Sequence, residues 1–157
     1  MEQFSPPLMN LEQVRNDLSF VRSWSGRENY HFTWPFPHQT ISCDVYFRAP
    51  KKNVDQAQLD RLNAFVQDYA RYIPQFDEFI AQSTRAYERW AFLKGSVGIV
   101  EFQVIDFPLD TTKYDFVLVA AKTYERLLWK RSIGFRAEFR NGEIISMKRC
   151  RSCTDDN

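Results

Sequence analysis

The sequence predicts an α+β fold, in which an antiparallel sheet carries a central pair of helices on one face. Apolar residues recur at helical spacing between residues 55 and 93, and strand-like patterns lie on either side of that segment. Asn141-Gly142 separates two apolar-rich runs, and this dipeptide signals a C-terminal β-hairpin because a type I′ turn needs positive φ at both positions. Strands and helices segregated in this way favour α+β over a doubly wound sheet, in which they alternate.

The N-terminal third is expected to hold one short helix followed by strands. Apolar residues spaced by three and four positions predict an amphipathic helix that ends before Gly26: Leu8, Leu11, Val14, Leu18 and Val21. Residues 31–34 alternate weakly before Pro35 and Pro37, which predicts an edge or bulged strand. Residues 40–47 alternate well and predict a second strand, one face of which carries Ile41, Cys43, Val45 and Phe47.

The middle of the chain is expected to form the helical pair. Asp55 is a good N-cap, and the apolar residues after it recur at helical spacing: Leu59, Leu62, Phe65, Val66, Tyr69 and Ile73. Pro74 lies where a second helix can start, because its missing N–H costs nothing in a first turn. The periodicity continues to about Leu93, and Gly95 ends it.

The remaining elements are predicted to be strands. Residues 99–105 predict a strand that ends before Pro108. Residues 116–121 form a continuous apolar run, which is typical of a central strand covered on both faces. Residues 131–139 and 143–147 are the two arms of the predicted hairpin.

Length and composition predict a single domain over residues 1–157, with a short polar tail at about 150–157. Hydrophobic residues make up 44% of the chain and aromatic residues 16%, enough to exclude disorder as the main state. No apolar run approaches the roughly 18 residues that a membrane span needs. The N-terminus has no signal-peptide pattern and the chain has three cysteines, an odd number, so we expect a cytoplasmic protein.

The cysteines and histidines of the sequence form no complete catalytic or metal-binding pattern, so we expect neither an enzyme nor a cofactor. Cys150 and Cys153 form a CxxC pair, but no second ligand pair completes a zinc site and the short tail cannot form the helix of a redox motif. We therefore interpret them as tail thiols without a fixed role. His31 and His38 are candidate general bases, yet no nucleophile beside them looks activated, and surface histidines without a role are commoner.

The acidic residues also have ordinary interpretations. Asp77 and Glu78 begin the second predicted helix, where negative charge complements the helix dipole. Asp106 and Asp110 flank Pro108, and we expect them to take part in turn formation. The sequence thus predicts no catalytic residue and no metal ligand.

Charge is distributed unevenly along the chain. Residues 122–151 contain 9 basic and 3 acidic side chains, whereas the whole chain has a formal net charge of +1. Such a segment suits a protein interface or a solvated face equally well. Nucleic acid ranks third, because the pI of 7.7 is below the value above 9 typical of nucleic-acid-binding domains. The candidate partner-binding residues are Tyr124, Arg126, Trp129, Lys130 and Arg131.

Three stretches of the chain carry a resemblance to a known group. They are Trp24-Ser25-Gly26, the segment Gln56–Tyr87 with its Ile73-Pro74, and Ile133–Ile145 with its Asn141-Gly142. With these the chain resembles the small bacterial cytoplasmic immunity proteins of polymorphic or contact-dependent toxin systems. The shared motifs are hydrophobic patterns, so no binding residue is transferred by position.

The resemblance implies a non-enzymatic protein that neutralises a cognate toxin domain by direct binding, either by covering its active site or by clamping a remote face. Aromatic and arginine anchors would lie at the centre of such an interface. From the residues themselves we expect no cofactor and, without a long apolar run, no membrane association. The alternative is a small nucleic-acid-binding domain that uses residues 122–151, with Tyr124 and Trp129 stacking on bases.

Overall fold

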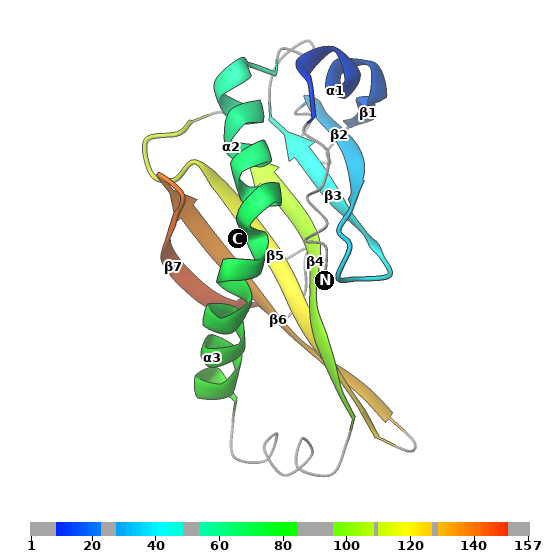
Figure 1. Ribbon diagram of the computed structural model, residues 1–157, viewed down its shortest axis with the longest axis vertical. Helices are drawn as coiled ribbons and strands as arrows, with labels where there is room; N and C mark the ends of the chain where they lie inside the picture. The colour runs from blue at the N-terminus through cyan, green and yellow to red at the C-terminus, as the bar shows by residue number, and fades with distance from the viewer. Residues whose placement is uncertain are drawn as a thin grey trace.

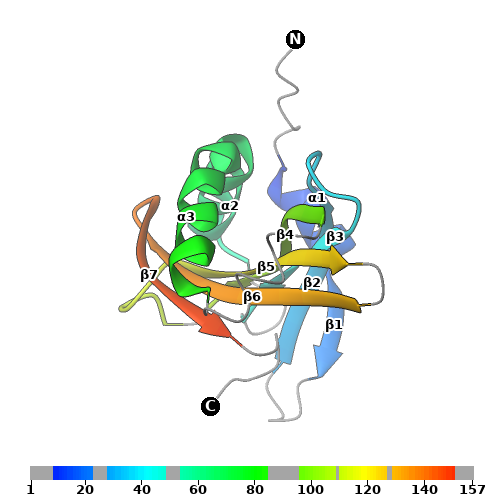
Figure 2. The ribbon, with the colours of Figure 1, turned by 90° about the horizontal axis from the view of Figure 1, so that it is seen from below.

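A computed structural model describes residues 9–22, 28–48, 54–84, 96–108, 110–126 and 129–150. In these ranges seven strands form one sheet in sequence order, with helices on one face (Figures 1 and 2). The α+β prediction is therefore confirmed. The strands are β1 (Ser19–Arg22), β2 (Glu28–Pro35), β3 (Ser42–Phe47), β4 (Ser96–Phe107), β5 (Phe116–Arg126), β6 (Trp129–Arg140) and β7 (Glu143–Cys150).

The sheet is mixed, so the prediction of an entirely antiparallel sheet is wrong. Strands β3 and β4 run parallel, and every other neighbouring pair is antiparallel. The helical pair lies between β3 and β4 in the sequence, and it carries the chain back across the sheet before β4 begins. A parallel pair needs a long crossover of this kind, usually helical, so the same helices that cover the sheet also set its one parallel contact.

The first helix is shorter than predicted. Helix α1 (Leu11–Asp17) begins after Asn10, whose side chain accepts a hydrogen bond from the Gln13 backbone N–H at 2.8 Å. It ends where Leu18 adopts an extended backbone. The segment that contains Val21 is not helical but forms β1, which pairs with β2.

Helix α2 (Gln56–Asp68) starts as predicted, at Asp55. The Asp55 carboxylate accepts a hydrogen bond from the Gln58 N–H at 2.7 Å, and the Gln58 side chain accepts one from the Asp55 N–H, which together form a capping box. A 3₁₀ turn (Tyr69–Tyr72) then joins α2 to α3 (Ile73–Ser83), and Pro74 lies in the first turn of α3 as expected. Helix α3 ends at Ser83 because Thr84 has an extended backbone, so the prediction of a longer helix is wrong at Thr84. The rest of the predicted helix, to Leu93, lies in residues 85–95, outside the described ranges.

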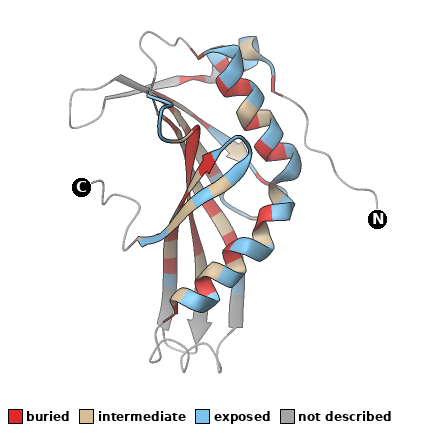
Figure 3. Ribbon diagram, turned by 90° about the vertical axis from the view of Figure 1, so that its left-hand side faces the viewer, coloured by how far each residue is buried: buried red, intermediate tan, exposed pale blue. Residues whose placement is uncertain are grey.

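The core lies between this helical layer and the sheet, where buried residues of α2 and α3 meet those of β3 to β6 (Figure 3). Aromatic rings fill much of it. Phe65 of α2, only 3% exposed, has five rings around it at centroid distances between 5.4 and 6.1 Å. They belong to Phe36, Tyr72, Phe102, Phe116 and Phe139. This explains much of the aromatic content of the chain.

Strand β2 is interior only in its first half, where residues 28–31 pair with β1. From Phe32 to Pro35 its described pairing is with β3 alone, so the edge prediction for residues 31–34 is wrong at His31 and confirmed for the rest, and Pro35 is tolerated at this open edge. Strand β5 is central as predicted, between β4 and β6. Consecutive buried residues from Phe116 to Leu118 confirm that both of its faces are covered there.

The loop after β2 takes the place of a strand beside β4. Register pairs with β3 reach only from Val104 to Phe107 of β4. Next to this stretch, the Gln39 side-chain amide donates to the Phe102 carbonyl at 2.8 Å and accepts from the Phe102 N–H at 2.7 Å. One side chain therefore satisfies both polar groups of a backbone position that β3 does not reach.

The Asn-Gly hairpin forms as predicted between β6 and β7. Arg140 pairs with Glu143, and Asn141 and Gly142 have φ values of 52° and 75°. The turn is tied to the rest of the molecule: the Asp115 carboxylate accepts from the Asn141 N–H at 2.7 Å, and the Gly142 carbonyl accepts from Arg71 Nη2 at 2.7 Å and from the Tyr72 hydroxyl.

Replacing Tyr72 by phenylalanine is expected to lower the free energy of unfolding by about 0.5–1.5 kcal/mol. The variant keeps the ring and loses the hydroxyl, while Arg71 still satisfies the Gly142 carbonyl. Urea unfolding measures the difference. Tyr46→Phe is the control, since no partner of its hydroxyl is described; an equal loss in both variants would show that the bond to Gly142 adds nothing.

Candidate functional site

The candidate partner-binding residues meet at the end of the β5–β6 hairpin. The register pairs Tyr124 with Arg131, Glu125 with Lys130 and Arg126 with Trp129. In Figure 1 this end of the hairpin extends past the lower end of α3. The backbone thus places three basic residues and two aromatic ones on adjacent positions of two paired strands.

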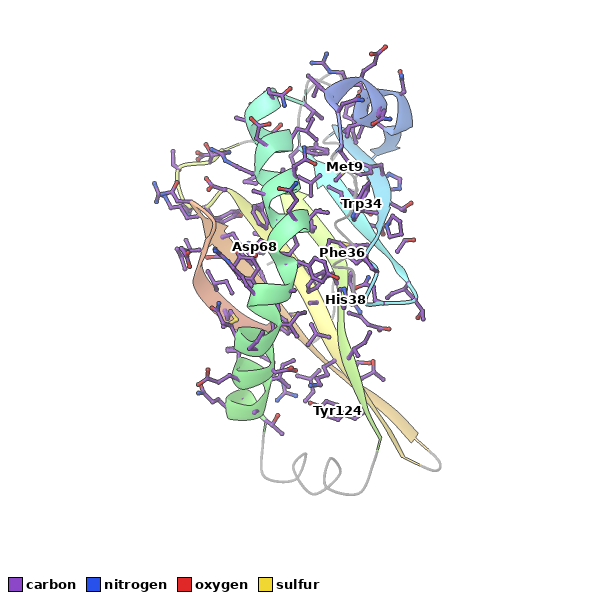
Figure 4. All side chains as sticks on the ribbon, viewed as in Figure 1. Met9, Trp34, Phe36, His38, Asp68 and Tyr124 are labelled. Atoms are coloured by element: carbon purple, nitrogen blue, oxygen red, sulfur yellow. The ribbon has the colours of Figure 1, made fainter. Side chains whose placement is uncertain are left out.

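Of these five side chains only that of Tyr124 is described. It is half-buried and packs against the hydrophobic core near the lower end of the sheet (Figure 4). Tyr124 is therefore at most partly available to a partner. The side chains of the other candidates, Arg126, Trp129, Lys130 and Arg131, lie outside the described residues.

Other basic residues of segment 122–151 are engaged within the molecule. Lys122 Nζ lies 2.5 Å from Asp77 Oδ1 of α3, and its side chain is only 15% exposed. Arg149 donates to the Ser83 carbonyl at the end of α3, at 3.1 Å. Arg136 lies 3.5 Å from Glu138. The segment is thus not one continuous cationic surface, although Arg140 and Lys148 are exposed.

The acidic candidates have structural partners. Helix α3 begins at Ile73 and has no acidic residue in its first turn, so the prediction that Asp77 and Glu78 begin this helix and complement its dipole is wrong. Asp77 instead pairs with Lys122, and Glu78 accepts a hydrogen bond from Gln82 at 2.9 Å. Asp106 belongs to β4 and not to a turn. Its carboxylate forms a bidentate ion pair with the guanidinium of Arg48.

Asp110 does form a turn as expected. It accepts a hydrogen bond from the Thr112 N–H at 2.9 Å. Hydrogen bonds from Thr112 lower the pKa of this carboxyl group. The negative charge of Asp110 is therefore used locally, to hold the turn.

The two histidines are held in different surroundings. His31 stacks on Tyr46 of β3 at a ring distance of 5.3 Å. His38 stacks on Tyr69 at 4.8 Å, and its Nε2 lies 2.9 Å from the Val100 carbonyl. Figure 4 shows His38 and Phe36 beside β4, and His38 contacts Tyr69 of the helical layer and Phe102 of β4, each at a ring distance of 4.8 Å. Both histidines therefore have evident packing roles.

Burial lowers the pKa of His38 below its ordinary value of 6.5, against the opposing effects of the Val100 hydrogen bond and Glu101. As the pH falls through 6.5, His38 of the unfolded chain takes up a proton before His38 of the folded chain does. We therefore expect the free energy of unfolding to fall with decreasing pH in this range.

Urea unfolding between about pH 8 and about pH 5 measures this effect. The variant His38→Gln keeps an amide that can donate to Val100 and should have a shallower dependence on pH near 6.5. An unchanged slope in the variant would show that another group causes the loss of stability.

The cysteines fit structural roles where they are described. Cys43 is fully buried, and burial raises the pKa of its thiol, which disfavours the reactive thiolate. Cys150 is the last residue of β7 and not part of the tail, whereas Cys153 lies outside the described residues. Within the described ranges, no three metal-binding side chains gather into a site, and none of the helices is long and apolar enough to cross a membrane.

A pocket of about 400 Å³ lies between the helical layer and the Asn141-Gly142 turn. Its lining combines aromatic rings with charged side chains: Arg61, Ala64, Phe65, Asp68, Arg71, Tyr72, Asp115, Phe116, Asn141 and Gly142. Sequence reasoning missed it, because its residues come from three separate parts of the chain. The only available signal was the spacing of two charged residues: Arg61 and Asp68 are seven positions apart, which places them on the same face of the helix α2.

No family model, curated protein or solved structure matches this chain.

Proposed function

We propose that this chain is a non-enzymatic binding protein, an immunity protein that neutralises a cognate bacterial toxin in the cytoplasm. The observation that carries the proposal is the end of the β5–β6 hairpin. There the register sets Arg126 beside Trp129 and Glu125 beside Lys130 on paired backbone positions, past the end of α3. Arginine and tryptophan are the residue types most enriched among the anchors of protein interfaces.

The charge of this hairpin end suits a toxin with an acidic face. Arg126, Lys130 and Arg131 lie within six residues of sequence that contain no acidic residue, and Glu125 directly precedes them. Opposite charges across an interface raise the rate of association and favour the correct partner. The toxin would thus be met first by the basic hairpin end, and buried anchors would then hold it.

The experiment is co-expression in bacteria with the toxin domain encoded next to this chain, followed by purification of the complex. The expected result is growth of cells that express both proteins, and co-purification of the two. Growth arrest despite a folded, expressed chain, with no complex, would refute the proposal. The same chain is then tested in a mobility-shift assay at low salt, because salt-sensitive binding of nucleic acid would favour the alternative function of segment 122–151.

A further inference from the structure

The pocket beside the Asn141-Gly142 turn has the build of a small-molecule site. Its volume of about 400 Å³ lies within the range of roughly 300–1,000 Å³ that is usual for such sites. Phe65 of α2 and Phe116 of β5 belong to its lining, but each is only 3% exposed, so the two rings offer a ligand little surface. The lining that a ligand meets is therefore mainly the polar and charged side chains around them.

One wall of the pocket is rigid. The hairpin turn that forms it is tied down at Asn141 by Asp115, and at Gly142 by Arg71 and Tyr72. A turn held at both residues keeps its shape when the pocket is empty. Ligand binding therefore costs little ordering of the wall.

Arg61 supplies the polar group that this pocket offers to a ligand. Its side chain is 37% exposed, and its described ion pair is with Asp115, from Nη2 to Oδ1 at 3.6 Å, which is too long for a hydrogen bond. A guanidinium carries five N–H donors in a planar fork that matches a carboxylate. Donor capacity at Arg61 thus remains for a ligand.

The two carboxylates of the pocket each have a described partner besides Arg61. Asp68 lies 3.1 Å from Arg71 Nε, and Asp115 accepts from the Asn141 N–H. The Nη2 group of Arg71 in turn donates hydrogen bonds to the Gly142 carbonyl, the Tyr72 hydroxyl and the Glu143 carboxylate. Asp68 keeps its pair with Arg71, and Asp115 keeps its hydrogen bond from Asn141, when Arg61 turns from Asp115 toward an anion.

We propose that this pocket binds small carboxylates, with the carboxylate of the ligand on the guanidinium of Arg61. This site lies beside the β6–β7 turn, whereas the proposed toxin contact lies at the end of the β5–β6 hairpin. Its test is therefore independent of the proposed function.

Benzoate is the probe, and benzamide and benzylamine are its neutral and cationic counterparts of similar size. Each is titrated into the ¹⁵N-labelled full chain while amide NMR shifts are recorded. We expect benzoate to shift the amides of Ala64, Phe65, Asn141 and Gly142, and to bind about ten-fold more tightly than benzamide, because only benzoate forms charge-assisted hydrogen bonds. Benzylamine is expected to bind more weakly still.

Two variants separate charge from shape. Arg61→Gln is expected to reduce the affinity for benzoate to that for benzamide, a loss of about ten-fold. Ala64→Phe puts a ring into the pocket and should abolish binding of both probes. Lys148→Gln removes a positive charge from exposed β7 and is the matched control, which should bind benzoate as the parent chain does. Circular dichroism checks the fold of each variant.

The proposal is overturned if benzoate causes no shifts at these amides, if benzylamine binds more tightly than benzoate, or if Arg61→Gln binds benzoate with unchanged affinity. Equal losses in Arg61→Gln and Lys148→Gln would likewise overturn it, because they would show general attraction to positive charge. A loss confined to Arg61→Gln and Ala64→Phe supports it.

Discussion

Replacing Phe65 by alanine is expected to lower the free energy of unfolding by about 3–5 kcal/mol, the usual cost of truncating a buried phenylalanine. Phe65 lies at the centre of the aromatic core, where five rings from the helices, the sheet and the loop after β2 surround it. Truncation therefore leaves a cavity bordered by several separate elements. Equilibrium unfolding in urea measures the loss.

Phe79→Ala is the matched control on α3. Phe79 is only half-buried, and its described ring contact is with Phe135 at 6.0 Å. Its loss of stability should therefore be clearly smaller than that of Phe65→Ala. Equal losses in the two variants would contradict the central place of Phe65 in the core.

Reversing the charges of Arg126 and Lys130 to glutamate is expected to lower the rate constant of association with the toxin by about ten-fold or more at low salt. If both side chains are at the surface, stability should change by no more than about 0.5 kcal/mol. This prediction rests on the proposed function. Stopped-flow or surface-based kinetics with the purified toxin domain measures the rate, and urea unfolding measures stability.

The double variant Arg140→Glu/Lys148→Glu is the control, since it makes the same change in net charge at exposed positions of β6 and β7. It should associate close to the parental rate if the end of the β5–β6 hairpin is the contact. Equal slowing in both double variants would show steering by total charge alone. Unchanged association in Arg126→Glu/Lys130→Glu would place the contact elsewhere.

Features determined by local sequence were predictable. The start of α2 depends on Asp55 and the residues just after it, and the hairpin depends on two residues that tolerate positive φ. The meeting of Arg126 with Trp129 was likewise within reach, because only two residues separate these positions. Short-range physics is sufficient in each case.

Features determined by contacts between distant parts of the chain could not be predicted from the sequence. The spacing of Leu18 and Val21 fits a helix, yet Val21 belongs to β1, and only pairing with β2 decides for the strand. Nothing near Asp44 indicates that its neighbour across the sheet is Val104, in a parallel register. The pocket needed the same knowledge, since Arg61 and Asp115 are brought together by the packing of α2 on the sheet.

The parallel seam between β3 and β4 has a consequence for how the chain folds. The hairpins of β4 to β7 join strands that follow one another closely, so they can form with little loss of chain entropy. The seam joins Asp44 to Val104, sixty positions further along, and closing so long a loop costs more than closing a hairpin. We therefore expect β4 to β7 to assemble first and β1 to β3 to dock last. The hydrogen bonds between the Gln39 amide and Phe102 of β4 should form in this last step.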